Sequence, residues 1–200
     1  MDEKSLISRI IKNNVETNGK ILEEEGVLTM IEKIAGEMIG AFRNGKKVLL
    51  CGNGGSAADA QHIAAELGGK FYLDRDPLFA EALHGNSSYL TAVANDYSYD
   101  EVFVRAVRAM GKEKDILIGI STSGNSLNVI KAIEAANKLG MITIGFTGET
   151  GGKIKDVCKY IIKVPSSDTP RIQEAHILIG HIVCEIVEKE IFGKKHIKEI

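Results

Sequence analysis

Apolar and polar residues follow two distinct periods along this chain. Four short runs are almost continuously apolar, which is typical of strands buried on both faces, and they lie at 48–51, 115–120, 141–147 and 160–164. A further run at 77–83 is a plausible strand, although Glu81 within it is unusual for a central strand. Elsewhere apolar residues recur at threes and fours, the period of a helix. This pattern predicts two helices within 5–43, a helix after 56, a short helix before 158, and helices at 87–94, 99–110, 127–139 and 171–192.

Three strands run directly into loops of small or hydroxylated residues, and a helix follows each loop. The loops lie at 52–56, 121–126 and 147–152. This rhythm is typical of a parallel α/β sheet with right-handed crossovers. We therefore expect an α/β protein: a three-layer α-β-α sandwich with a five-stranded parallel sheet. Ligands of such sheets bind outside the carboxyl ends of the strands, which is where all three loops should lie.

The two helices before the first strand suggest an N-terminal helical arm. Residues 1–200 are expected to form a single domain, with an α/β core at 46–193 and helices within 1–45 that pack against a neighbouring subunit. The alternative, that these helices simply cover one face of the sheet, is equally compatible with their apolar stripes.

Composition narrows the class of protein. The net charge is −2 and no dense cluster of Lys and Arg precedes the last residues, which disfavours binding to nucleic acid. No apolar run has the length of a membrane span, and the charged N-terminus lacks the apolar core of a signal peptide. The cysteines, Cys51, Cys158 and Cys184, show no paired spacing and suit free thiols in a reducing cytoplasm.

Two of the loops have the chemistry of ligand cradles. The glycine-rich loop 52–56 leaves backbone N–H groups uncovered before a helix N-terminus. The loop 121–126 offers four hydroxyls at another helix N-terminus, which suits a phosphate group. A plain N-cap would explain one of those hydroxyls but not four. A dinucleotide site at 52–56 is a minor alternative, because it leaves loop 121–126 without a purpose.

Polar side chains at helical spacing indicate a reactive or metal site. His62 and Glu66 lie four residues apart on one helix, and Gln173 and His181 lie eight apart on the last helix, so each pair shares a helix face. The four side chains could converge as ligands of a metal such as zinc. They could equally form an acid/base pair with a polar orienting group. The alternative for each histidine is a purely structural, hydrogen-bonded helix residue, and this alternative is strongest for His176, His84 and His196.

Five segments are specific enough to indicate a family. They are CGNGGSAADAQHIAAE, AVANDYSYDEVF, GISTSGNSLNVIKAIEAA, FTGETGG and RIQEAHILIGH. They resemble the sugar isomerase (SIS) superfamily and, within it, the phosphoheptose isomerases, over nearly the whole chain. The resemblance implies the flavodoxin-like SIS fold. It also implies isomerisation of D-sedoheptulose 7-phosphate to D-glycero-D-manno-heptose 7-phosphate, the first step toward ADP- or GDP-heptose for lipopolysaccharide or other surface glycans.

The resemblance also implies roles for individual residues. Glu66 would move the proton between C1 and C2, and His181 would be its catalytic partner. The implied ligands of a zinc ion in each subunit are His62, Glu66, Gln173 and His181. The implied substrate-binding residues are Asn53, Gly54, Gly55, Asn95, Asp96 and Gln173 for the sugar, and Ser121, Thr122, Ser123 and Ser126 for the phosphate. The family is a homotetramer with active sites between subunits.

Two rival interpretations come from the same superfamily. Some relatives are non-catalytic proteins that associate with the bacterial replication initiator, and they lack the catalytic carboxylate and histidine. Because this chain keeps Glu66 and His181, we expect an enzyme. Regulatory phosphosugar sensors of this superfamily are usually fused to a DNA-binding domain, for which no residues are left over here.

Overall fold

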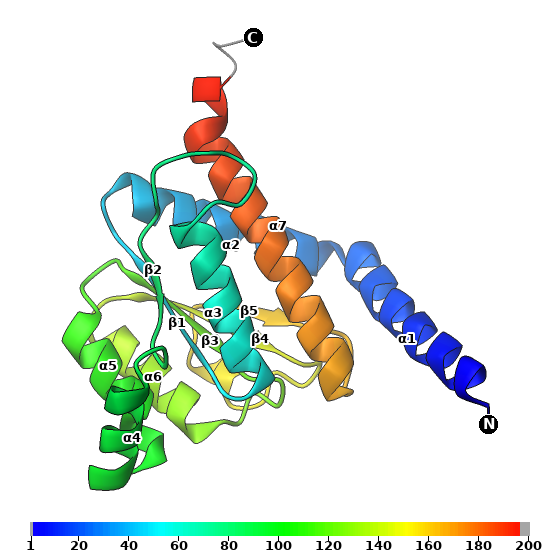
Figure 1. Ribbon diagram of the computed structural model, residues 1–200, viewed down its shortest axis with the longest axis horizontal. Helices are drawn as coiled ribbons and strands as arrows, with labels where there is room; N and C mark the ends of the chain where they lie inside the picture. The colour runs from blue at the N-terminus through cyan, green and yellow to red at the C-terminus, as the bar shows by residue number, and fades with distance from the viewer. Residues whose placement is uncertain (1, 197–200) are drawn as a thin grey trace.

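The structure is a computed structural model that describes residues 2–196, with side chains described for 2–193. One sheet of five parallel strands runs through its centre in the order β2-β1-β3-β4-β5 (Figure 1). The strands are β1 (Val48–Gly52), β2 (Ala80–Ala82), β3 (Ile116–Ile120), β4 (Ile142–Thr147) and β5 (Tyr160–Lys163). The α/β fold with a five-stranded parallel sheet, predicted from the sequence, is therefore confirmed.

Helices cover both faces of this sheet. They are α1 (Glu3–Glu23), α2 (Glu25–Arg43), α3 (Gly55–Gly68), α4 (Ser87–Asp96), α5 (Val102–Met110), α6 (Leu127–Lys138) and α7 (Thr169–His196). Single 3-10 turns occur at Tyr99–Glu101 and Ile154–Asp156. None of the helices in the described range combines the length and the apolar content needed to cross a membrane.

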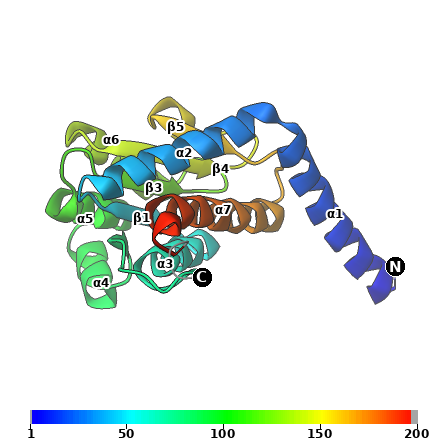
Figure 2. The same cartoon turned by 90° about the horizontal axis from the view of Figure 1, so that it is seen from above.

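Each central strand sends alternate side chains to two separate cores, because successive residues of a strand point to opposite faces. In β1, Val48 and Leu50 join the core beneath α2, α3 and α7, whereas Leu49 and Cys51 join the core beneath α5 and α6. All residues of β1 and β3 are buried. Viewed from above, α7 lies between α2 and α3 on one face of the sheet (Figure 2). The protein is therefore a three-layer sandwich.

The second strand is shorter than the pattern predicted. Only Ala80–Ala82 pairs with β1, and β2 forms an edge of the sheet. Edge strands in natural proteins are often short and carry charge. The side chain of Glu81 is exposed at this edge, so its presence in a strand needs no buried partner.

The two N-terminal helices have different environments. Helix α2 buries one apolar face against the core and packs beside α7 and β5. The alternative that we left open, cover for one face of the sheet, thus describes α2. Helix α1 extends away from the body of the protein, and its buried residues are only Thr17 and Ile21 (Figures 1 and 2).

Candidate active site

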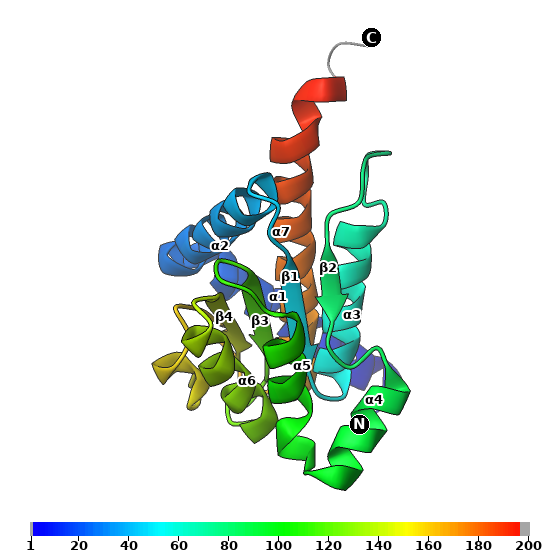
Figure 3. The same ribbon diagram turned by 90° about the vertical axis from the view of Figure 1, so that its left-hand side faces the viewer.

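The order of the strands creates a topological switch point at the carboxyl edge of the sheet. β1 and β3 are neighbours, and the chain leaves them toward opposite edges, to β2 and to β4. Such a switch point is where open α/β sheets bind ligands. The loops after these two strands, 53–54 and 121–126, flank it, and α4 lies beyond the strand ends (Figure 3).

The glycine-rich loop holds the amide of Asn53 in a fixed orientation. Its backbone turns at Gly54, which has φ of 56°, a conformation that favours glycine. The amides of Asn53 and buried Asn128 donate to each other, both at 2.9 Å, and the Tyr99 hydroxyl donates to Asn53 Oδ1 at 3.1 Å. Asn53 Nδ2 therefore keeps one hydrogen for a ligand. Asn128 and Tyr99 were missed by the sequence analysis, although both lie inside the segments that carry the resemblance.

The hydroxyls of the second loop are not used to cap the helix behind it. Ser126 occupies the N-cap of α6, yet its side chain makes no capping hydrogen bond. Its Oγ instead faces Ser121 Oγ at 2.9 Å. Gly124, with φ of 66°, lets the loop turn, and an added Cβ there would lie 2.2 Å from the Gly151 carbonyl oxygen. The plain N-cap interpretation therefore does not account for these hydroxyls, and phosphate binding stays a prediction.

A pocket of about 260 Å³ adjoins the outer side of this loop. It lies where the loops after β3, β4 and β5 meet, and Thr122 and Ser123 contribute to its wall. The remaining lining comes from Asn125, Gly148, Glu149, Thr150, Ser166, Ser167, Thr169 and Ile172. The loop 165–170 is thereby placed beside loop 121–126.

A carboxylate and two imidazoles meet between α3 and α7. His62 Nε2 lies 3.1 Å from Glu66 Oε1 and 3.1 Å from His181 Nε2. The side chains of His62 and Glu66 are 48% and 24% exposed, so a solute can reach them. The sequence predicted that His62 and Glu66 would share a face and that His181 would join them from the last helix. The structure brings all three together within one chain.

The geometry of this group fits a metal ion. Its three ligand atoms all lie within 4.8 Å of one another. Nitrogen and oxygen ligands at zinc distances of about 2.0–2.2 Å in a tetrahedron are about 3.3 Å apart, close to the two 3.1 Å separations that His62 makes. Two imidazole nitrogens that face each other at 3.1 Å must share a proton or a cation. His62, Glu66 and His181 could therefore hold a metal.

Gln173, the fourth predicted ligand, lies nearer the beginning of α3. A Cβ on Gly55 would be 2.5 Å from its Nε2 atom, so the amide rests directly over Gly55. α3 and α7 run side by side, and Gly180 contacts Ile63 further along in the same register. The proximity of Gln173 to the glycine loop fits a sugar-binding role, and its ligation of a metal stays a prediction.

Two other predicted residues come from α4 rather than from α3 or α7. Asn95 and Asp96 end α4, where Asn95 Nδ2 donates to Asp96 Oδ1 at 3.0 Å, and both side chains are exposed. Their role in holding the sugar stays a prediction. The prediction that His176 is a structural, hydrogen-bonded helix residue is confirmed, because its ring is buried and Nε2 donates to the Thr147 carbonyl at 3.1 Å.

Asp59 is a polar group of the site region that the sequence analysis did not single out. It lies one turn before His62 on α3, and its Oδ2 atom is buried without a hydrogen-bond partner among the described residues. Burial raises the pKa of this carboxyl to about 6, and the neighbouring His62 opposes the rise. Its three-residue spacing from His62 is the sequence signal that could have identified it.

The sequence and the fold of this chain are similar to those of known proteins. Residues 12–148 match the SIS domain family. The chain is 56% identical to the phosphoheptose isomerase of Clostridium acetobutylicum over 192 residues, 96% of this chain and 98% of that protein. It is 52% identical to that of Aneurinibacillus thermoaerophilus, over 94% of each chain. The structure of the phosphoheptose isomerase from Neisseria gonorrhoeae matches with a TM-score of 0.88 at 40% identity, covering 94% of this chain and 100% of that one.

Proposed function

This chain belongs to the phosphoheptose isomerase family of SIS-domain proteins, and from that premise we propose which of its residues carry the reaction. The chain is an aldose–ketose isomerase that converts D-sedoheptulose 7-phosphate to D-glycero-D-manno-heptose 7-phosphate in heptose biosynthesis. The observation that carries the assignment of residues is the meeting of Glu66, His62 and His181 at one accessible point.

Glu66 and His181 move the protons. Isomerisation passes through an enediol(ate), which requires a base above two adjacent carbons and a group that serves their oxygens. The Glu66 carboxylate takes a proton from C1 of the ketose while His181 gives a proton to the oxygen on C2. Glu66 then returns its proton to C2, and His181 takes the proton from the oxygen on C1. The product is the aldose, and both side chains return to their starting states.

We propose that His62, Glu66 and His181, with Gln173 as a fourth ligand, hold zinc. When bound, zinc would supply a positive charge that polarises the sugar oxygens. Glu66 Oε1 faces His62, so Oε1 would bind the metal and Oε2 would accept the proton. His181 likewise faces His62 through Nε2, which leaves its other ring nitrogen for the sugar oxygens.

The remaining predicted residues bind the substrate. Ser121, Thr122, Ser123 and Ser126 hold the phosphate, which is supported by a helix N-terminus whose neighbouring hydroxyls are not used for capping. Gly54 and Gly55, with the amides of Asn53 and Gln173, hold the sugar, together with Asn95 and Asp96. The second hydrogen on Asn53 Nδ2 supports this role.

We further propose a homotetramer in the cytoplasm, with active sites between subunits. Ile7, Ile11 and Val15 form a row at four-residue spacing on α1, and each is more than half exposed. On α7, Ile182 and Ile186 are also exposed, close to His181 in the sequence. Apolar surface of this kind is typical of contacts between subunits. The free thiols of the three cysteines suit a reducing compartment.

A turnover assay tests the assigned activity. The protein is given D-sedoheptulose 7-phosphate, with and without added zinc, and the proton spectrum is followed for the aldose signal. We expect conversion to an equilibrium mixture. Absence of turnover under both conditions would contradict an enzyme and favour the non-catalytic interpretation.

A substitution of the base tests the residue assignment. Glu66→Gln should abolish turnover and leave phosphosugar binding, measured by calorimetry, largely intact, because the amide keeps the shape but cannot accept the proton. Glu134→Gln makes the same chemical change on an exposed position of α6 and serves as the control. Turnover by Glu66→Gln at the wild-type rate would assign the base elsewhere.

A further inference from the structure

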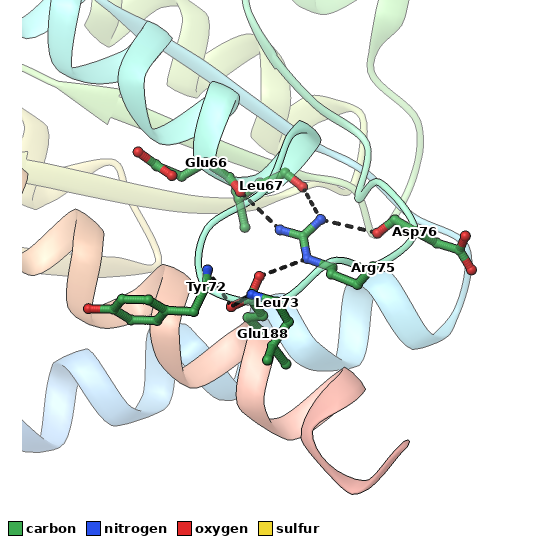
Figure 4. Close-up of polar contacts among 7 residues, drawn as sticks. All are labelled: Glu66, Leu67, Tyr72, Leu73, Arg75, Asp76 and Glu188. Carbon is green, nitrogen blue, oxygen red and sulfur yellow. Dashed lines mark hydrogen bonds and ion pairs between the residues drawn. The ribbon is translucent and has the colours of Figure 1, made fainter. Parts of the chain in front are cut away.

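A buried ion pair connects the end of α3 to α7, the two helices that carry the active-site group. Arg75 Nε and Glu188 Oε1 are 3.0 Å apart, and each side chain is only 2% exposed (Figure 4). Arg75 belongs to the loop between α3 and β2, and Glu188 lies on α7, two turns after His181. Burial of two charges is expensive unless their hydrogen bonds are satisfied.

The guanidinium of Arg75 satisfies the last turn of α3. Its Nη2 donates to the Glu66 carbonyl at 2.9 Å, and Nη1 donates to the carbonyls of Leu67 at 2.8 Å and Asp76 at 3.1 Å. Carbonyls at the end of a helix lack partners within the helix, and a cation there is favoured by the helix dipole. Arg75 therefore fixes the peptide group of Glu66, the residue that is proposed to transfer the proton.

Glu188 ties the same loop to the other helix. Its Oε2 accepts from the backbone N–H groups of Tyr72 at 2.9 Å and Leu73 at 3.1 Å (Figure 4). The Phe192 ring lies 5.4 Å from the Arg75 guanidinium carbon, and Phe71 of the same loop packs beside the His181 ring. The loop thus contacts both helices through one buried network.

The network joins the two halves of the reactive group. Arg75 holds the backbone carbonyl of Glu66, and Glu188 belongs to the helix that carries His181. We propose that the Arg75–Glu188 pair is a positioning device that sets Glu66 relative to His181, an inference that rests on the proposed function. A small displacement of a catalytic group costs rate even when its cause lies away from the reacting atoms. The pair does not itself touch the substrate.

The test separates positioning from folding. Arg75→Lys keeps the charge, but one ammonium cannot reach four acceptors in the fixed fork of a guanidinium. We expect kcat for D-sedoheptulose 7-phosphate to fall by about 10- to 100-fold. We expect KM to stay within about twofold, because the phosphate loop lies at the edge of the sheet and is unchanged. Rates are expressed per folded protein, measured by circular dichroism at the assay temperature.

A matched control is offered by α2, where an arginine pairs with the same helix, α7. Arg43 forms an exposed ion pair with Glu190 of α7 and donates to its carbonyl, but it connects α7 to α2 rather than to α3. Arg43→Lys should leave both kcat and KM at wild-type values. Glu188→Gln is the second variant, which keeps the shape of the side chain and removes its charge. It should lower kcat in the same way, and it replaces Arg75→Lys in the test if that variant does not fold.

The outcomes are distinct. A wild-type kcat per folded protein in Arg75→Lys and Glu188→Gln, with only a lower melting temperature, would make the pair purely structural and overturn the inference. A rise in KM at unchanged kcat would also overturn it. Failure of the wild-type protein to isomerise the sugar would instead refute the proposed function, and the inference with it.

Discussion

Substitution of Gly55 separates the position of Gln173 from the stability of the fold. A Cβ atom on Gly55 would lie 2.5 Å from Gln173 Nε2 and 2.8 Å from its Cδ and Oε1 atoms. Real Cβ atoms do not approach other atoms so closely, so the amide must move. Because it is the free end of a flexible side chain, we expect it to turn away without moving the backbone.

The expected magnitudes differ for stability and activity. Gly55 opens α3 with a backbone that alanine also adopts, so Gly55→Ala should raise the free energy of unfolding by about 0.4–1 kcal/mol. A hydrogen bond lost at a ligand site costs about 1–3 kcal/mol. If Gln173 binds the sugar or the metal, kcat/KM should therefore fall by about 5- to 150-fold. The variant would be at least as stable as the wild type but much less active.

The assay compares Gly55→Ala, Gln173→Ala and the double variant. The rate is measured from the aldose proton signal, and stability from thermal unfolding. Because both single substitutions remove the same interaction, the double variant should be no slower than Gln173→Ala alone. Wild-type kcat/KM in Gly55→Ala, or losses that add in the double variant, would refute a role for the observed position of Gln173.

Three further predictions concern other parts of the chain. Burial lowers the pKa of His176 to about 4, so below pH 6.5 the unfolded state binds a proton that the folded state does not bind. The free energy of unfolding should therefore fall by about 3 kcal/mol between pH 6.5 and 4. Denaturant titrations at each pH should show that His176→Gln lacks this component. Ser121→Ala should raise KM by about tenfold with a smaller effect on kcat, whereas Ser167→Ala in the neighbouring loop should not, as steady-state kinetics would reveal. Ile11→Glu on α1 should reduce the assembled mass in light scattering without lowering the helix content, and an unchanged mass would remove α1 from the subunit contact.

The sheet was predictable because its central strands are buried on both faces. Such strands read as continuous apolar runs, and the small-residue loops after them mark the carboxyl edge. Residues 77–83 were less informative, since an edge strand tolerates charge and only Ala80–Ala82 is paired. That His62 and Glu66 share a helix face followed from their spacing; the sequence also offered His181 of the last helix as a partner, and the structure places it 3.1 Å from His62.

Long-range polar contacts were not predictable from one sequence. Arg75 and Glu188 are separated by more than a hundred residues, and no local pattern relates them. One signal was present: Glu188 lies in a row at four-residue spacing between Cys184 and Phe192, both buried. A charge in an apolar row requires a partner, although the sequence does not say which one. The different environments of α1 and α2 could not be predicted either, because both helices carry an apolar stripe.

The Asn53–Asn128 amide pair has a consequence for the chemical ageing of the protein. Asn53 precedes Gly54, and an asparagine followed by glycine is the pair most prone to deamidation, in which the next backbone nitrogen attacks the side-chain amide. Three hydrogen bonds hold the Asn53 amide against Asn128 and Tyr99, so it is seldom free to rotate into the geometry of that attack. Once deamidated, the new carboxylate would face the Asn128 oxygen, acceptor against acceptor. The amide pair therefore slows deamidation in the loop that is proposed to bind the sugar.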